Sequence, residues 1–222
     1  MPMTDMVKHL LIINIIFFVG SFLVPEATEI LALHYFESDK FRLWQPITHM
    51  FMHGGLMHIF FNMFALVSFG SALEHFWGGK KFLFFYFSCG IGAALVHSAV
   101  NYYGYHQGLD FLVSEGINKS EIVSLLTQEK FDTRWQEMMN PSDFTQMIQS
   151  YIGKAVGASG AVTGIIYSAI LLYPDMTIGI FGIIPMPAYI FGIAYLLYSI
   201  YGMKSRRDNI GHTAHFGGAI GG

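Results

Sequence analysis

Six stretches of the chain are rich in apolar residues, and polar segments separate them. A helix needs about 20 mostly apolar residues to cross a hydrocarbon core of ~30 Å, and residues 54–73 and 82–103 reach that length without a formally charged side chain. The pattern predicts membrane-spanning helices over residues 10–24, 54–73, 82–103, 157–173, 178–201 and 209–222. The predicted fold class is an all-α membrane protein.

The segment 104–154 breaks this pattern, because it holds seven acidic and four basic side chains. Helix-start signals stand at Asn118-Lys-Ser-Glu121 and Asn140-Pro-Ser-Asp143. We expect a water-exposed extramembrane insert of short amphipathic helices between the third and fourth spans. Its apolar positions fall at helical spacing and are placed to lie on the membrane surface or to form a packed cover: Ile122, Leu125, Leu126, Phe144, Met147 and Ile148.

Prolines interrupt the pattern after the fourth apolar stretch. Pro174 stops that stretch, and Pro185 and Pro187 fall in the first half of the fifth, where they should kink or break a helix.

The two ends of the chain call for separate interpretation. No small-x-small cleavage site follows residues 10–24, so we expect a retained helix rather than a signal peptide. The last stretch, Gly211–Gly222, would span about 18 Å at ~1.5 Å per residue, which is short of a ~30 Å core. We therefore expect a truncated sixth helix, with roughly eight or more further apolar residues in the natural protein.

Composition agrees with a chain that crosses the membrane several times. Of the 222 residues, 53% are hydrophobic and 12% are charged, unlike ordinary soluble domains. The net charge of −3 does not favour nucleic-acid binding, and the single cysteine, Cys89, excludes a disulfide or a cysteine-based metal site within the chain.

The head of the fourth stretch carries a candidate nucleophile, Ser159, in Gly157-Ala158-Ser159-Gly160. Alone, such a tetrapeptide more often serves close helix packing. The stretch has only seventeen residues, so its start is expected below the membrane surface, after non-helical chain and beside a wet recess. Backbone N–H groups of Ala158 and Ser159 would face that recess at the positive end of the helix dipole, as candidate oxyanion donors.

A serine hydroxyl needs a base to take its proton, and His215 is our candidate. Small residues should let the two helices approach closely: Gly160, Gly164, Gly218 and Gly222. Asp208 is about two helical turns before His215, and no carboxylate stands nearer in the spans. We therefore predict a Ser-His dyad rather than a triad.

His58 and Asn62 stand four residues apart and so share one face of the second predicted helix. Taken alone, such residues more often form hydrogen bonds between helices. Beside a nucleophilic serine, they become candidate donors to the oxygen of a tetrahedral intermediate.

Together, these segments resemble the rhomboid family of intramembrane serine proteases. The resemblance covers roughly residue 40 onward, apart from the insert. It rests on four motifs: the loop 44–53, His53-x-x-x-x-His58-x-x-x-Asn62, Gly157-Ala158-Ser159-Gly160, and Ala214-His215-Phe216-Gly217-Gly218-x-x-x-Gly222.

The resemblance implies a six-helix bundle that hydrolyses peptide bonds in or near transmembrane helices of single-span or polytopic membrane proteins, without a cofactor or a metal. It also implies that Ser159 is the nucleophile, His215 the base, and His58 and Asn62 the oxyanion donors. One position departs from the family pattern. Some members carry a tyrosine beneath the catalytic imidazole four residues after the serine, where this chain has Thr163. What orients His215 is therefore left open.

Basic residues flanking the spans mildly favour an N-terminus outside. We follow the resemblance instead, which implies an inside N-terminus and an active site on the extracytoplasmic side. The expected location is the bacterial cytoplasmic membrane, with the lipid bilayer as surroundings.

Two alternatives remain open. The first is a rhomboid-like protein that binds membrane proteins without cutting them, against which the presence of both Ser159 and His215 argues. The second is a metal transporter that uses His53, His58, His212 and His215. Its weakness is that Glu74, at the end of a span, is the only candidate intramembrane carboxylate. A zinc metalloprotease is weaker still, since His-Glu-x-x-His is absent.

Overall fold

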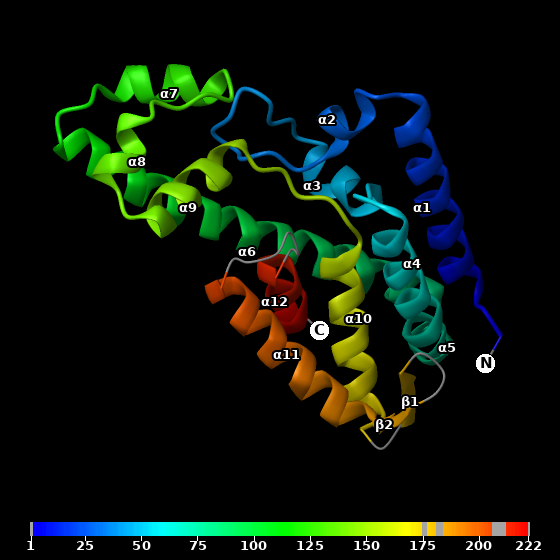
Figure 1. Ribbon diagram of the computed structural model, residues 1–222. Helices are drawn as coiled ribbons and strands as arrows, with labels where there is room; N and C mark the ends of the chain where they lie inside the picture. Colours follow the sequence, from blue (N-terminus) through cyan, green and yellow to red (C-terminus); the bar gives the residue numbers. More distant parts are fainter. Residues whose placement is uncertain (1, 175–176, 181–183, 206–211, 222) are drawn as a thin grey trace.

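The computed structural model describes residues 2–174, 177–180, 184–205 and 212–221, and these residues are mostly helical (Figure 1). The first half of the chain contains α1 (Asp5–Leu23), α2 (Ala27–Leu31), α3 (Gln45–Thr48), the 3₁₀ helix η1 (His49–Phe51), α4 (Leu56–Ala65), the π-helical turn η2 (Leu66–Gly70), α5 (Ser71–Trp77) and α6 (Gly79–Ser114). The second half contains α7 (Lys119–Thr127), α8 (Arg134–Met138), α9 (Pro141–Ile152), α10 (Ser159–Leu172), β1 (Thr177–Ile180), β2 (Ile184–Pro187), α11 (Ala188–Ser205) and α12 (His212–Gly221).

Three helical segments are long and apolar enough to cross a membrane within the described part of the chain: Asp5–Leu23, Leu56–Trp77 and Gly79–Ser114. The middle segment joins α4, η2 and α5 without a break. Two shorter apolar helices, Ser159–Leu172 and Ala188–Leu197, accompany them. The first four predicted spans therefore all coincide with helices, although their ends differ by several residues.

The described residues are mostly helical, as an all-α fold requires, and the expected break at Pro185 and Pro187 is present. The fifth helix does not begin at residue 178, however, because Thr177–Ile180 and Ile184–Pro187 are strands. Strands β1 and β2 pair antiparallel there, with Thr177 opposite Pro187 and Ile180 opposite Ile184. The prolines account for the difference, because Pro185 and Pro187 lack the N–H that a helix or an inner strand needs. Being two residues apart, they turn their nitrogens to the same, unpaired edge of β2. The helix α11 begins directly after them, at Ala188.

The third helix is longer than the apolar run that predicted it. α6 continues through residues 104–114 and has 36 residues, or about 54 Å at ~1.5 Å per residue. That length exceeds a ~30 Å hydrocarbon core by roughly 24 Å. The first part of the predicted insert is thus the last three turns of α6, on which α7, α8 and α9 are built (Figure 1).

The helices of the insert start where their capping residues predict. The side chain of Asn118 accepts a hydrogen bond from Ser120 N–H, and that of Asn140 accepts one from Asp143 N–H. Each bond satisfies an N–H that lacks an acceptor within its own helix. The helix-start signals of the sequence are therefore confirmed.

A second hydrophobic core joins the insert to the end of α6. Ile122, Leu126 and Met147 are fully buried in it, and Leu125, Phe144 and Ile148 pack against it. Trp135 of α8 is also fully buried there, and Tyr35 enters from the loop before α3. The apolar faces of α7 and α9 are therefore packed against the end of α6. Of the two expectations for these residues, the packed cover is the one that the structure supports.

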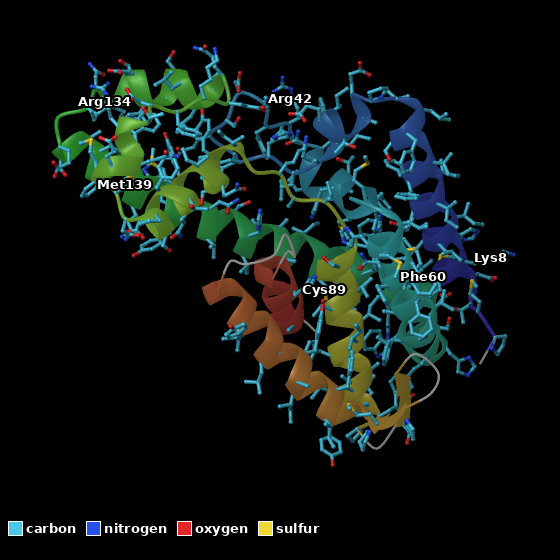
Figure 2. All side chains as sticks on the ribbon, viewed as in Figure 1. Lys8, Arg42, Phe60, Cys89, Arg134 and Met139 are labelled. Carbon is cyan, nitrogen blue, oxygen red and sulfur yellow. The ribbon has the colours of Figure 1, made fainter. Side chains whose placement is uncertain are left out.

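The main core surrounds α10, which lies in the middle of the helices (Figure 1). Residues 160–166 and 168–170 of α10 are all buried, so every face of this helix meets protein. In Figure 2, Cys89 of α6 lies toward α10, while Arg134 and Met139 lie at the far end of the molecule, in the insert. The serine that begins α10 is therefore held by the most enclosed helix of the chain.

Candidate active site

Ser159 is the first residue of α10, and residues 153–158 before it are not helical, as predicted. Leu33 and Ala155 form an isolated antiparallel bridge through two backbone hydrogen bonds of 2.9 Å. Gly157 N–H donates to the carbonyl oxygen of His49, also at 2.9 Å. Two separate segments of the preceding loop therefore fix the position of the approach to Ser159.

Gln45 holds that loop together from inside. Its side chain is fully buried, accepts a hydrogen bond from His34 N–H at 3.3 Å, and donates to the carbonyl oxygens of Ile30 and Lys40. The backbone carbonyl oxygen of Gln45 lies 2.9 Å from Nδ1 of His49. The loop 30–49 is consequently a fixed frame for residues 155–157.

The start of α10 leaves backbone donors at Ser159. The first hydrogen bond of the helix runs from Val162 N–H to the carbonyl oxygen of Ala158, at 2.9 Å. The N-cap residue, Ala158, is fully buried and has no side chain that could accept a bond from the first turn. The N–H groups at this end therefore have the polarity needed to hold an oxyanion.

His58 lies directly against the approach to Ser159. A Cβ built on Gly157 would stand 2.8 Å from both Cε1 and Nε2 of His58, and 3.6 Å from Oγ of Ser159. Gly157 also has φ +125°, a conformation that favours glycine. The imidazole and the hydroxyl thus share one small space, which stays open because residue 157 has no side chain.

The hydrogen bond that Nδ1 of His58 accepts determines the tautomer of the neutral ring. Gly54 N–H donates to Nδ1 at 3.3 Å, so Nδ1 carries no proton and the neutral ring carries it on Nε2. Nε2, together with Cε1, forms the edge of the ring that lies against Gly157. His58 accordingly presents a donor, not an acceptor, to the space beside Ser159.

Asn62 follows one turn later on α4 and is buried. Its Nδ2 donates to the carbonyl oxygen of His58 at 3.0 Å, within the same helix. An amide NH₂ group has two hydrogens, so one remains after this bond. The bond also fixes the direction of the side chain relative to His58.

His215 lies on α12, which packs tightly between α6 and α10. A Cβ on Gly218 would overlap the carbonyl oxygen of Gly160, and one on Gly217 would stand 2.9 Å from Cα of Ala93 in α6. Gly164 lies against the carbonyl oxygen of Gly218 in the same way. Gly222 lies outside the described residues.

These contacts join the two helices that carry the predicted catalytic residues. Ser159 is the neighbour of Gly160, and His215 is one helical turn before Gly218 on the same side of α12. His215 is buried, with 8% of its surface exposed.

One neighbour of His215, Tyr195, was not expected from the sequence. The hydroxyl of Tyr195, on α11, lies 3.0 Å from Nδ1 of His215, and the ring centroids are 5.6 Å apart at 32°. Thr163, where a tyrosine would match some family members, is buried on α10. Nothing in the sequence distinguishes Tyr195 from Tyr189 of the same helix, because only the packing of α11 decides which of them faces α12.

The ring of His53 packs against the ring of His58. The two rings are 5.1 Å apart at 66°, and Nε2 of His53 is buried without a hydrogen-bond partner among the described residues. Burial, and secondarily the neighbouring His58, lowers the pKa of His53 to about 4. His53 is therefore neutral at physiological pH and contacts His58 through its ring.

Glu74 has a structural position that the sequence did not reveal. Its carboxylate accepts hydrogen bonds from Thr4 Oγ1 at 2.5 Å, Met6 N–H at 3.0 Å and Val7 N–H at 2.9 Å. It thereby caps the N-terminus of α1. This carboxylate is engaged away from the histidines that the transporter alternative invoked. His212 offers no comparison, since its side chain lies outside what the structure describes.

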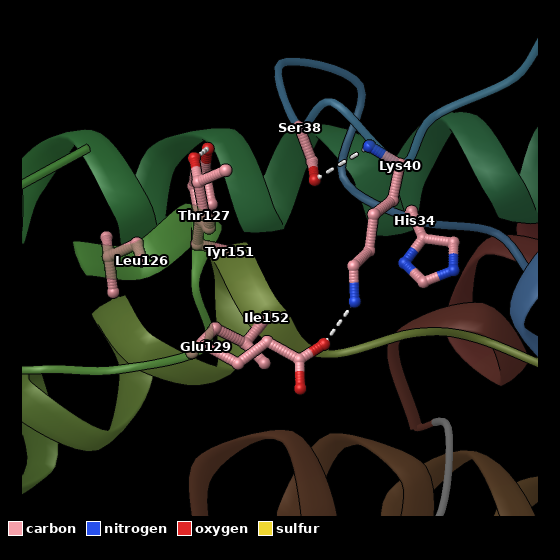
Figure 3. Close-up of a pocket in the computed structure, with 8 residues that line it drawn as sticks. All are labelled: His34, Ser38, Lys40, Leu126, Thr127, Glu129, Tyr151 and Ile152. Atoms are coloured by element: carbon pink, nitrogen blue, oxygen red, sulfur yellow. Dashed lines mark hydrogen bonds and ion pairs between the residues drawn. The ribbon is translucent and has the colours of Figure 1, made fainter. Parts of the chain in front are cut away.

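A small recess lies away from Ser159, between the loop before α3 and the insert (Figure 3). Its lining includes His34, Lys40, Glu129 and Tyr151. Lys40 is ion-paired there with Glu129 (Figure 3). The wet recess expected at Ser159 stays a prediction.

Comparison with known proteins identifies the family of this chain. A family model described as a Rhomboid domain matches residues 40–222. The chain is also 28% identical over 178 residues to "RHOMBOID-like protein 12, mitochondrial" of Arabidopsis thaliana. That match covers 80% of this chain and 44% of the relative, so the chain spans less than half of the relative's length. With its long apolar helices, the chain is a multi-pass integral membrane protein, and it belongs to the rhomboid family.

Proposed function

We propose that the chain is an intramembrane serine endopeptidase in which Ser159 and His215 form a catalytic dyad. The observation that carries this proposal is the packing of α12 onto the start of α10 through Gly218 and Gly160. It joins the helix that carries the buried imidazole of His215 to the helix that begins with Ser159. Nucleophile, base and oxyanion donors would then meet in one small space.

The proposed reaction begins when Oγ of Ser159 attacks the carbonyl carbon of a substrate peptide bond. Nε2 of His215 takes the hydroxyl proton and later gives it to the leaving amine. The remaining acyl-enzyme ester is then hydrolysed by a water molecule, which His215 activates in the same way. No metal or cofactor takes part in these steps.

The oxygen of the tetrahedral intermediate would receive hydrogen bonds from several donors. The backbone N–H groups of Ala158 and Ser159 supply the first, His58 Nε2–H the second, and the remaining Nδ2 hydrogen of Asn62 the third. The tautomer of His58 supports this role, since its Nδ1 already accepts from Gly54.

The proposed substrates are single-span or polytopic membrane proteins, cut in or near a transmembrane helix. We further propose six transmembrane helices, with α7–α9 outside the membrane. The proposed setting is the bacterial cytoplasmic membrane, with the active site on the extracytoplasmic side. The length of α6 supports an insert that stands beyond the hydrocarbon core.

The main alternative is a rhomboid-like protein that binds membrane proteins without cutting them. A fluorophosphonate probe separates the two, because it labels a serine only when a base activates the hydroxyl. We expect labelling at Ser159 and cleavage of a model transmembrane substrate. Both should be lost in Ser159→Ala and in His215→Ala, and both retained in the matched control Ser168→Ala on the same helix. Binding of a substrate without labelling or cleavage in the unmodified protein would favour the non-cutting alternative.

A further inference from the structure

We propose that Tyr195 is the positioning residue that orients His215, in place of the carboxylate of a catalytic triad. This inference rests on the proposed function, since it assigns a role within the Ser159–His215 dyad. It is drawn from the contact between the Tyr195 hydroxyl and Nδ1 of His215 at 3.0 Å.

The base of a serine protease has a specific requirement at each ring nitrogen. Nε2 must be unprotonated to accept the proton of Ser159, so the proton of the neutral ring belongs on Nδ1. A free imidazole exchanges between both tautomers and rotates about its side-chain bonds. An acceptor fixed at Nδ1 selects the productive tautomer and the ring direction together.

The Tyr195 hydroxyl lies at that position and can either donate to Nδ1 or accept from Nδ1–H. In the arrangement that we propose, it accepts. A phenol oxygen accepts a hydrogen bond from Nδ1–H while the phenol keeps its own proton. When His215 takes the proton of Ser159, the same oxygen lies next to the imidazolium and stabilises its charge. A neutral hydroxyl does this more weakly than a carboxylate, which suits a buried site where a second formal charge would be costly.

The packing of α11 determines where this hydroxyl lies. Tyr167 of α10 donates its hydroxyl proton to the carbonyl oxygen of Gly192 at 2.8 Å, and a Cβ on Gly192 would stand 2.9 Å from Ile170 of α10. Gly192 therefore faces α10 at close range. Tyr195, one turn later on the same side of α11, faces inward as well.

The ring of Tyr195 has a second support within its own helix. It stacks on Phe191, with centroids 5.9 Å apart and planes at 6°. Phe191 packs against the main hydrophobic core. The hydroxyl is thus carried by a ring that neighbouring residues already hold, which reduces the entropy lost in orienting His215.

Tyr195→Phe tests the role by removing only the hydroxyl. We expect kcat to fall about 3- to 10-fold, the size of one neutral hydrogen bond, with KM within about twofold of the unmodified protein. Fluorophosphonate labelling of Ser159 should slow by the same factor. Tyr189→Phe is the matched control, because it removes the hydroxyl of an exposed tyrosine on the same helix, α11.

A spectroscopic measurement reads the tautomer directly. In protein labelled with ¹⁵N-histidine, with the His215 signal assigned by comparison with His215→Gln, we expect the neutral ring to carry its proton on Nδ1. Tyr195→Phe should give a mixture of tautomers, while Tyr189→Phe should not. This measurement on the unmodified protein holds even if Tyr195→Phe fails to fold.

Three results would overturn the inference. They are a proton on Nε2 of neutral His215 in the unmodified protein, an unchanged kcat in Tyr195→Phe, and equal losses of kcat in Tyr195→Phe and Tyr189→Phe. Failure of the dyad itself has a different signature, namely continued cleavage by Ser159→Ala and His215→Ala whatever the behaviour of Tyr195→Phe.

Discussion

The backbone of Gly218 on α12 lies against the carbonyl oxygen of Gly160 on α10, so closely that a Cβ on Gly218 would overlap it. This contact joins the helix that begins with Ser159 to the helix that carries His215. The geometry of the proposed dyad therefore depends on a residue that takes no part in the chemistry.

Gly218→Ala should push α12 away from α10. We expect at least a tenfold loss of cleavage, because a displacement of about 1 Å can cost roughly 10²-fold in rate, and we expect a lower melting temperature. Gly92→Ala is the matched control, since a Cβ at Gly92 on α6 meets nothing within 4 Å. Normal cleavage by Gly218→Ala would show that the two helices need not touch at this point.

Gly157→Ala should impair the space beside Ser159 in two ways. The new methyl group would stand 2.8 Å from the His58 ring, and alanine is strained at φ +125°. We expect strongly reduced fluorophosphonate labelling. Gly55→Ala, at an extended glycine with no neighbour within 4 Å of its Cβ, should label normally. Equal labelling in both variants would contradict the shared space described for His58 and Ser159.

His58→Ala and Asn62→Ala should each lower kcat more than they change KM. Donors to an oxyanion act mainly in the transition state, and the expected loss is about 10²–10³-fold per donor. Steady-state kinetics on a transmembrane substrate would measure it, with Phe60→Leu on the outer side of α4 as a control (Figure 2). A rise in KM alone would reassign the residue concerned to substrate binding or helix packing.

An ion-pair cluster ties the insert to the loop before α3, and its contribution to stability should depend on pH. Lys154 pairs with Glu29, and Lys40 bridges Glu29 and Glu129. Hydrogen bonding to Lys154, opposed by burial and aided by Lys40, lowers the pKa of Glu29 from 4.5 to about 2.

Because this pKa is lower in the folded state, the stabilisation is present above about pH 4.5 and is lost as pH falls toward about 2. Glu29→Gln should therefore lower the melting temperature slightly at pH 7, and the difference should shrink below pH 4.5. The effect is expected to be modest and to weaken in salt, since Glu29 is 40% exposed. Glu26→Gln, on the same loop, is the control. A difference that grows on acidification would contradict the assignment.

The sequence alone determined the features that depend on neighbouring residues. Apolar runs located most of the helices, Asn118 and Asn140 marked the starts of α7 and α9, and the shortness of the fourth apolar run indicated non-helical chain ahead of α10. The spacing of His58 and Asn62 placed them on one helical face, and the structure has them joined by a hydrogen bond. Periodicity, capping and helix length are local properties, which is why a single chain reveals them.

Only the tertiary structure decided which distant residues meet. The polar composition of residues 104–114 concealed the end of α6, where Gln107, Asp110 and Ser114 stay exposed. The other face of this last part of α6 is buried in the second core, through Tyr105, Leu109 and Leu112. The pairing of residues 177–180 with 184–187 replaced the expected helix, and it depends on contacts between two separate segments. Glu74 became a cap for α1, and Tyr195 a neighbour of His215, through contacts across 67 and 20 residues of chain. Such contacts depend on how each helix is rotated against its neighbours, and that rotation is set by close packing of whole faces rather than by any local pattern.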